Sequence, residues 1–310
     1  MKKLVVIVGP TATGKSDLGV VLAQNCSSLH QASGLVGQGE IISADSRQVY
    51  RGLDIGTGKI THKEMRGIPH HLLDVVDPQK QFSVAEYKIL ADTAIADIYT
   101  LEHIPFLVGG SGMYISAVVD DQTFPDVPPN ETLRTELSQK SVAELFTLLE
   151  ARDPERAKNI EAQNPRRLIR ALEIVDALGT VPKQKEQELR EDVCMIGLDM
   201  PDEELQKRIT TRLQSRFENG MKEEAEALHA HGLSYERMHE LGLEYHFLAL
   251  LLKKELSKEE CVTQLNTAIW HYAKRQRMWF KRDKRIHWFH PKDTNAIQDI
   301  VYAYLVEKRN

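Results

Sequence analysis

The sequence predicts an α/β fold in which a doubly wound parallel sheet carries an inserted all-helical subdomain. Three observations lead to it: an apolar strand that enters a glycine-rich turn, further strands that alternate with helices, and a charge-rich helical stretch bounded by prolines. With 310 residues, 42% of them hydrophobic, the chain can bury a full core. We expect residues 1–120 and 193–310 to form the α/β core, and residues 121–192 to form the insertion.

The first half of the chain reads as strands alternating with helices. Residues 4–8 are a continuous apolar, mostly β-branched run, which is typical of a buried parallel strand, and residues 15–24 have helical apolar spacing. Residues 27–39 are rich in Ser, Gly and Gln, so we expect a surface loop there. A second strand is predicted at 40–43. A helix at 84–98 then leads to a third strand at 105–108.

The second half of the chain begins with a change in composition and in the spacing of apolar residues. Pro125, Pro128 and Pro129 interrupt the chain, and helix-period spacing with abundant charge continues to about Arg190. Strand character returns afterwards, which predicts that the sheet resumes. The remaining elements are predicted as strands at 193–198 and 286–289 and helices at 203–216, 221–230 and 257–281.

Composition narrows the class of protein. The formal net charge is −5, yet residues 274–285 form a strongly basic run, and Arg166, Arg167 and Arg170 form a second cluster. The three cysteines are far apart and lack the spacing of a zinc site or disulfide framework, so they read as small core or surface residues. The apolar run at 4–8 is too short for a signal peptide or a membrane span, which predicts a cytoplasmic protein with no membrane partner.

Residues Gly9 to Ser16 read GPTATGKS and match the phosphate-loop pattern between a predicted strand and a predicted helix, the context that this motif requires. Glycines allow backbone amides to surround phosphate oxygens, Lys15 neutralises charge, and the Ser16 hydroxyl can bind Mg²⁺. A chance glycine turn is the alternative. The motif indicates a polyphosphate ligand and does not separate a nucleotide from a diphosphate ester, so the expected core is of the P-loop NTPase type.

Two further loops, referred to below as corners, are predicted to follow strands at the same edge of the sheet. Asp45 follows the second strand, where ligands bind in doubly wound sheets, although Asp45 or Ser46 could simply cap a helix. Gly109, Gly110, Ser111 and Gly112 follow the third strand and suit a close approach to a ligand, or else an ordinary tight turn.

Several longer sequence motifs, called words below, resemble those of the bacterial tRNA dimethylallyltransferase family. The resemblance extends from residue 4 to about residue 289. P-loop kinases share only the first of these words. The words are GPTATGKS (9–16), ADSRQVYRGLDIGTGK (44–59), PHHLLD (69–74), FSVAEY (82–87), LVGGSGMY (107–114), NPRRLIRALE (164–173) and AKRQ (273–276).

The resemblance implies an enzyme that transfers a dimethylallyl group from dimethylallyl diphosphate to the N6 amine of adenosine 37 in a tRNA anticodon stem-loop, with Mg²⁺ and as a monomer. It implies that Asp45 is the general base, that Ser111 keeps a hydroxyl where the family usually has threonine, and that Arg212 acts near the diphosphate. The implied diphosphate-binding residues are Thr11, Ala12, Thr13, Gly14, Lys15 and Ser16. The implied tRNA-binding residues are Asp45, Ser46, Arg47, Gln48, Ser111, Arg134, Arg166, Arg167, Arg170, Lys274 and Arg275.

The chain departs from the family words at two places. Leu243 stands where a tyrosine is expected after Gly242, and Trp270 lies in a triplet that has lost an expected arginine. We expect these changes to affect tRNA docking and to leave the diphosphate site intact. His70 and His71 could orient substrate or be structural. The aromatic residues within the basic run could stack on bases, but their helical spacing favours a place in the core.

Three other functions stay open at this stage. A P-loop kinase would share the loop and an acid near Asp45, and it predicts ATP turnover. An adenylate isopentenyltransferase would modify free nucleotides, whereas the basic insertion favours an RNA acceptor. A non-catalytic RNA-binding protein would not need Lys15, Ser16 and Asp45 together.

Overall fold

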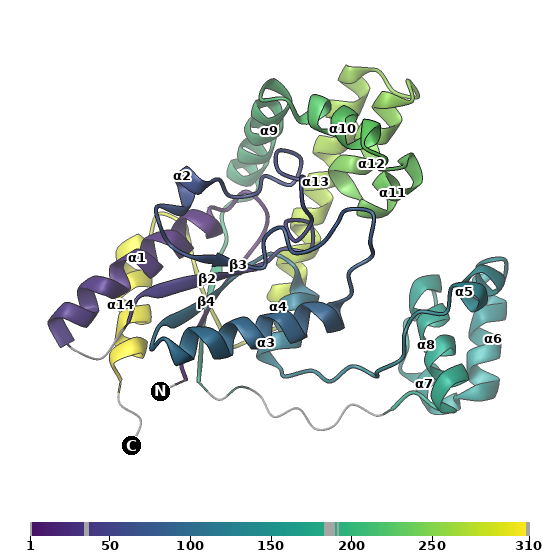
Figure 1. Ribbon diagram of the computed structural model, residues 1–310, viewed down its shortest axis with the longest axis horizontal. Coiled ribbons are helices and arrows are strands. Elements are labelled where there is room, and N and C mark those ends of the chain that lie inside the picture. The colour runs from purple at the N-terminus through teal and green to yellow at the C-terminus, as the bar shows by residue number, and fades with distance from the viewer. Residues whose placement is uncertain (1, 34–36, 183–189, 191, 308–310) are drawn as a thin grey trace. The chain divides into compact units, whose positions relative to one another are not determined.

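The protein is described by a computed structural model that covers residues 2–33, 37–182, 190 and 192–307 (Figure 1). The chain divides into two compact units. The first comprises Met1–Asp121 and Leu189–Asn310, and the second comprises Gln122–Glu188. Within the described residues, no helix combines the length and the apolar character needed to cross a membrane.

In the described part of the first unit, six parallel strands form one sheet with the order β3-β2-β4-β1-β5-β6. The central strand β1 pairs with β4 on one side and β5 on the other, and Val6 lies opposite Leu107 and Met195. The strands are β1 (Leu4–Val8), β2 (Gly39–Ala44), β3 (His70–His71), β4 (Ile104–Gly109), β5 (Val193–Leu198) and β6 (Ile286–Phe289).

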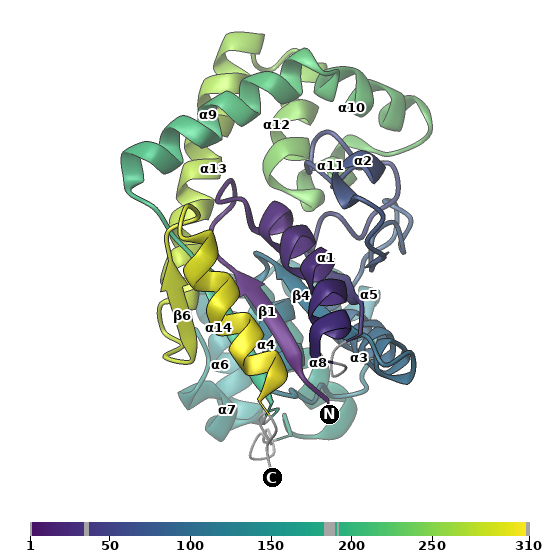
Figure 2. The same ribbon diagram turned by 90° about the vertical axis from the view of Figure 1, so that its left-hand side faces the viewer.

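Helices cover both faces of this sheet because strand side chains alternate between two apolar cores. Leu4, Val6 and Val8 enter one core, and Val5 and Ile7 enter the other. The helices α1 and α14 cover the second of these faces, as Figure 2 shows, and α3, α4 and α13 cover the first. The helices of this unit are α1 (Lys15–Ser33), α2 (His62–Met65), α3 (Val84–Thr100), α4 (Gly112–Val119), α9 (Asp202–Glu218), α10 (Met221–Ala230), α11 (Tyr235–Leu241), α12 (Leu243–Leu252), α13 (Lys258–Phe280) and α14 (Thr294–Val306).

The second unit is helical and has its own small core, in which Leu145, Leu149 and Leu168 are fully buried. Its helices begin at residues that cap them well, for example Ser141, which forms a capping box with Glu144. They are α5 (Glu131–Ser138), α6 (Val142–Arg152), α7 (Pro154–Lys158) and α8 (Pro165–Leu178).

The predicted α/β class is confirmed, and the strands expected at 4–8, 193–198 and 286–289 have those bounds. The surface loop expected at 27–39 is wrong for most of its length. Helix α1 continues to Ser33, and β2 already begins at Gly39, while residues 34–36 lie outside the described residues. Leu29, Gln31 and Ala32 favour a helix, and serines have a helix propensity that is not low enough to end one. The sequence patterns do not predict the short strand β3 or the helices α2, α4, α11, α12 and α14.

Candidate active site

The phosphate loop joins β1 to α1 through a backbone that turns sharply at three places. Gly9, Ala12 and Gly14 all have positive φ, at 143°, 66° and 91°. A Cβ at residue 9 would lie 2.4 Å from the carbonyl oxygen of Leu198 at the end of β5. Only glycine fits there, because the loop must pass close to the neighbouring strand before the helix begins.

Two side chains of the loop close it upon itself. The Thr13 hydroxyl is buried and donates to the carbonyl oxygen of Pro10 at 2.9 Å, so this side chain faces the loop interior. The ammonium of Lys15 donates to the same oxygen at 2.6 Å. Burial and the nearby positive charge of Arg212 lower the pKa of Lys15 to about 7, while Asp45 acts in the opposite direction. A bound anion would offset this loss and restore the charged form.

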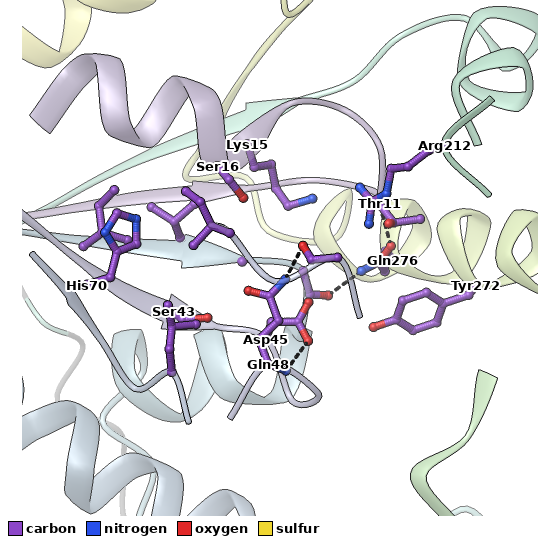
Figure 3. Close-up of a pocket in the computed structure, with 17 residues that line it drawn as sticks. Thr11, Lys15, Ser16, Ser43, Asp45, Gln48, His70, Arg212, Tyr272 and Gln276 are labelled. Carbon is purple, nitrogen blue, oxygen red and sulfur yellow. Dashed lines mark hydrogen bonds between the residues drawn. The ribbon is translucent and has the colours of Figure 1, made fainter. Parts of the chain in front are cut away.

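One pocket brings together most of the residues predicted for the reaction (Figure 3). It lies at the carboxyl edge of the sheet, where the loops after β1, β2 and β4 meet, and α9 and α13 contribute further side chains. The predicted site residues that line it are Thr11, Lys15, Ser16, Asp45, Gln48 and Arg212. Other lining residues with polar side chains are Ser43, His70, Tyr272 and Gln276.

One end of this pocket is cationic. Arg212 projects from α9 and is accessible to solvent, but it lies in a concave site where surrounding protein and the neighbouring Arg216 lower its pKa to about 10. Lys15 loses part of its charge for the same reason. Two cations that repel each other in a partly dehydrated site are stabilised when an anion binds between them.

The same pocket carries a carboxylate that is held by the backbone. Asp45 Oδ1 accepts hydrogen bonds from the amides of Arg47 at 2.8 Å and Gln48 at 3.4 Å. The predicted helix cap is thus present as a local turn, and it leaves Oδ2 without a hydrogen bond within the described residues. The hydroxyl of Ser111 accepts from the amide of Ser46 at 2.9 Å, which links the corners after β2 and β4.

The pocket wall at Gly58 belongs to a loop that is anchored from α10. The Glu224 carboxylate accepts the amides of Asp54, Ile55 and Gly56 at 2.7–2.9 Å. It also accepts the hydroxyl of Tyr245 at 2.7 Å.

Arg216 supports the same loop from α9. Its guanidinium is buried, and it donates to the carbonyl oxygen of Gly56 at 3.1 Å and to Glu244 at 3.2 Å. A Cβ at residue 58, where φ is 59°, would lie 1.9 Å from Arg216 Nη2. Only glycine can therefore occupy this position without displacing the arginine.

The two histidines of PHHLLD have different surroundings. His70 lines the pocket, and burial lowers its pKa. His71 Nε2 lies 2.6 Å from Glu40, which is also 2.6 Å from His103 Nδ1. His70 is thus a candidate for substrate contact, and His71 is structural.

The arginines predicted to bind tRNA differ in whether an acidic side chain pairs with them. Arg134 and Arg170 both form ion pairs with Glu173, a carboxylate whose side chain is only 1% exposed. Arg167 lies 3.2 Å from Glu161, and Arg166 is exposed. All four lie in the second unit, and two of them neutralise a buried acid.

Lys274 and Arg275 lie on α13, within one turn of the pocket residues Tyr272 and Gln276. The Lys274 ammonium lies over the ring of Trp270, 5.2 Å from its centroid, and the Arg275 guanidinium lies 5.9 Å from that of Tyr272. The expectation that aromatics here belong to the core is confirmed for Phe280, which is buried, whereas Tyr272 lines the pocket.

Comparison with known proteins decides the family. The model of the IPP transferase family matches residues 48–283. The chain belongs to the IPP transferase family. A relative named tRNA dimethylallyltransferase 1, from Geotalea uraniireducens, is 43% identical over 289 residues, which covers 92% of this chain and 91% of the relative. The tRNA dimethylallyltransferase of Anoxybacillus flavithermus is 39% identical over 302 residues, covering 96% and 93%.

Solved structures of IPP transferases agree with this assignment. The full-length tRNA isopentenylpyrophosphate transferase from Bacillus halodurans superposes with a TM-score of 0.72 at 36% identity, covering 98% of this chain and 97% of that one. A eukaryotic dimethylallyltransferase described as acting on tRNA gives a TM-score of 0.81 at 26% identity, covering 97% and 78%. The P-loop NTPase-like fold predicted from the sequence is therefore the fold of this family.

The site also has the oxygen donors that a hard divalent cation prefers. The hydroxyl of Ser16 makes no hydrogen bond within the described part of the chain, and the Asp45 carboxylate lines the same pocket. Among the described residues, no three His, Cys, Asp or Glu side chains gather to hold a metal. The donors present thus fit an ion that is bound mainly by substrate phosphate oxygens and water, with few protein ligands.

Two residues that shape the pocket, Gln276 and Glu224, are not among the site residues predicted from the sequence. Gln276 belongs to the AKRQ word, and its four-residue spacing from Tyr272 could have placed both on one face of α13. Glu224 gave no such signal, because its role depends on a loop that lies 168–170 residues away in sequence.

Proposed function

We propose that this protein transfers a dimethylallyl group from dimethylallyl diphosphate to the N6 amine of an adenosine next to the tRNA anticodon, position 37, and releases diphosphate. One observation carries the proposal: a phosphate loop with two cations and an ordered carboxylate line the same pocket. The names of the relatives, which are tRNA dimethylallyltransferases, support the same reaction.

Asp45 is proposed as the general base. The adenine N6 lone pair is delocalised into the ring, so the amine attacks well only if its proton is removed as the new C–N bond forms. Because Oδ1 is held by two backbone amides, Oδ2 is the oxygen available to take that proton. The Ser111 hydroxyl is proposed to contact the substrate beside it.

The phosphate loop is proposed to bind and stabilise the leaving group. As the bond between allyl C1 and oxygen breaks, negative charge grows on the diphosphate, and Lys15, Arg212 and the amides of residues 11–16 are donors suited to that charge. A Mg²⁺ ion held by Ser16, the diphosphate and water would add a fixed positive charge there.

The acceptor is proposed to be the anticodon stem-loop of tRNA, bound by a cytoplasmic monomer. An adenosine must leave its stack to reach a pocket, which costs a few kcal/mol and favours unpaired loop bases. Phosphate contacts from Arg166, Arg167, Lys274 and Arg275 would offset this cost. Ser46, Arg47 and Gln48 follow the base and are proposed to contact the RNA near the target nucleotide.

The proposal is tested by incubating the protein with Mg²⁺ and labelled dimethylallyl diphosphate, in parallel with unmodified tRNA, with AMP, or with ATP in place of the allyl donor. We expect label in tRNA at the adenosine beside the anticodon. Label in AMP alone would point to a free-nucleotide transferase, and ATP turnover without transfer would point to a kinase.

A further inference from the structure

Gln276 connects the phosphate loop to the corner after β4. Its Oε1 accepts the amide of Thr11 at 2.8 Å, and its Nε2 donates to the carbonyl oxygen of Gly110 at 2.9 Å. The residue is 7% exposed and lines the pocket. Figure 3 shows it beside Thr11.

These two bonds require a carboxamide. One partner is a donor and the other an acceptor, so a side chain must offer one acceptor and one donor on a planar group of this length. A leucine of similar size satisfies neither, and a glutamate places an oxygen against the Gly110 carbonyl unless the carboxyl is protonated. Gly110 has adapted to the contact, since a Cβ there would lie 2.3 Å from Gln276 Nε2.

The neighbouring residue extends the connection to a third strand end. Arg277 donates to the Asp199 carboxylate and to the carbonyl oxygen of Met200, each at 2.9 Å, just after β5. One turn of α13 therefore holds the loops that follow β4, β1 and β5, which are adjacent strands in the sheet.

The connection by Gln276 joins the two halves of the reaction site. Thr11 begins the part of the loop proposed to hold the diphosphate, while Gly110 precedes Ser111, whose hydroxyl binds the amide of Ser46 beside Asp45. One amide side chain thus connects the leaving-group side of the pocket to the base side, beyond the paired strands that carry both loops.

We propose that Gln276 is a positioning residue that sets the phosphate loop against the Asp45–Ser111 side of the pocket, so that allyl C1 and the attacking amine meet in line. The inference rests on the proposed transfer reaction. Displacement of reacting groups by about 1 Å can cost on the order of 10²-fold in rate even when binding survives. Loss of Gln276 should accordingly lower kcat and change diphosphate affinity little.

The experiment measures single-turnover transfer to tRNA and, separately, the Kd for dimethylallyl diphosphate, in Gln276→Leu, Gln276→Glu and Gly110→Ala. Met278→Ala is the control, because Met278 is exposed on the same helix. We expect Gln276→Leu and Gly110→Ala to lose about 10²-fold in rate with the Kd within about threefold of wild type. Thermal unfolding of each variant checks that it folds.

Gln276→Glu provides the readout that a merely structural role would not give. Its rate relative to wild type should rise several-fold from pH 8 to pH 6, because a protonated glutamate again donates to Gly110. The ratio for Gln276→Leu should stay flat. The titratable and charged groups around this position are Lys15, Asp45, His70, Arg212, Tyr272 and Arg277. Gln276→Leu keeps all of them and adds no charge, so a pH dependence that Gln276→Glu shows and Gln276→Leu lacks comes from the new carboxyl group.

Two results would overturn the inference. One is a Gln276→Leu rate within threefold of wild type, and the other is a rate loss fully explained by weaker diphosphate binding with a flat Gln276→Glu ratio. If the wild-type protein itself transfers nothing to tRNA, the proposed function fails, and the positioning role fails with it. Normal wild-type transfer with an inert Gln276 removes the positioning role alone.

Discussion

The protonation state of Lys15 is expected to make the affinity for diphosphate depend on pH. Burial and Arg212 lower the pKa of Lys15 to about 7 in the free protein, so the lysine is about 90% charged at pH 6 and about 10% charged at pH 8. A bound diphosphate raises that pKa, because an adjacent anion favours the ammonium. Binding therefore takes up a proton above pH 7. From these values, the Lys15 contribution weakens diphosphate affinity by about tenfold between pH 6 and pH 8.

The assay is isothermal titration of the protein with inorganic diphosphate at several pH values, in buffers of different ionisation enthalpy. Lys15→Arg is the matched control, since an arginine stays charged throughout the range and the titration of diphosphate itself is common to both proteins. We expect wild type to take up nearly one proton more than Lys15→Arg at pH 8. Equal proton uptake and equal pH dependence in the two proteins would refute the reasoning.

Four further predictions concern the loop that borders the pocket and two arginines of the second unit. Glu224→Gln should destabilise the protein by about 1–3 kcal/mol in chemical unfolding and weaken diphosphate binding, because an amide nitrogen would face backbone N–H groups of the anchored loop; unchanged values would show that the anchor is dispensable. Arg134→Ala should destabilise the second unit by about 1.5–3 kcal/mol in chemical unfolding, because buried Glu173 loses two charge-assisted hydrogen bonds and keeps those from Arg170 and the Asn130 amide; an unchanged free energy of unfolding would contradict this. Arg166→Ala should keep full stability and lower the salt dependence of tRNA binding by about one unit of slope, and a loss of stability there would contradict its exposed position. Gly58→Ala should lower the unfolding temperature and the diphosphate affinity together, because φ is 59° and the Cβ would meet the guanidinium behind it; wild-type values for both would contradict this fit.

The sequence could predict those parts of the fold and site that depend on local patterns. The strand at 4–8 and the phosphate loop follow from an apolar run and from glycines at fixed spacing, and the structure has both. Asp45 was predicted at the sheet edge because parallel strands end there together. It lines the pocket with Lys15 as a consequence of that topology.

Other features depend on long-range contacts that have no local signature. The carboxamide of Gln276 meets Thr11 across 265 residues of sequence, and Glu224 meets Gly56 across 168. Arg134 is expected from the sequence to contact tRNA, and only the folded unit shows that it also pairs with Glu173. A charge in a sequence does not reveal whether it faces solvent or another charge.

The central claim is that Asp45 takes the proton from the acceptor amine in the pocket that holds the diphosphate. Asp45→Asn tests it most directly, because the amide oxygen keeps the acceptor for the backbone amide of Arg47 and only the basic group is lost. In single-turnover transfer to tRNA, we expect both substrates to bind with near wild-type affinity and the rate to fall by about 10²–10⁴-fold. Transfer at a rate within fivefold of wild type would contradict the account.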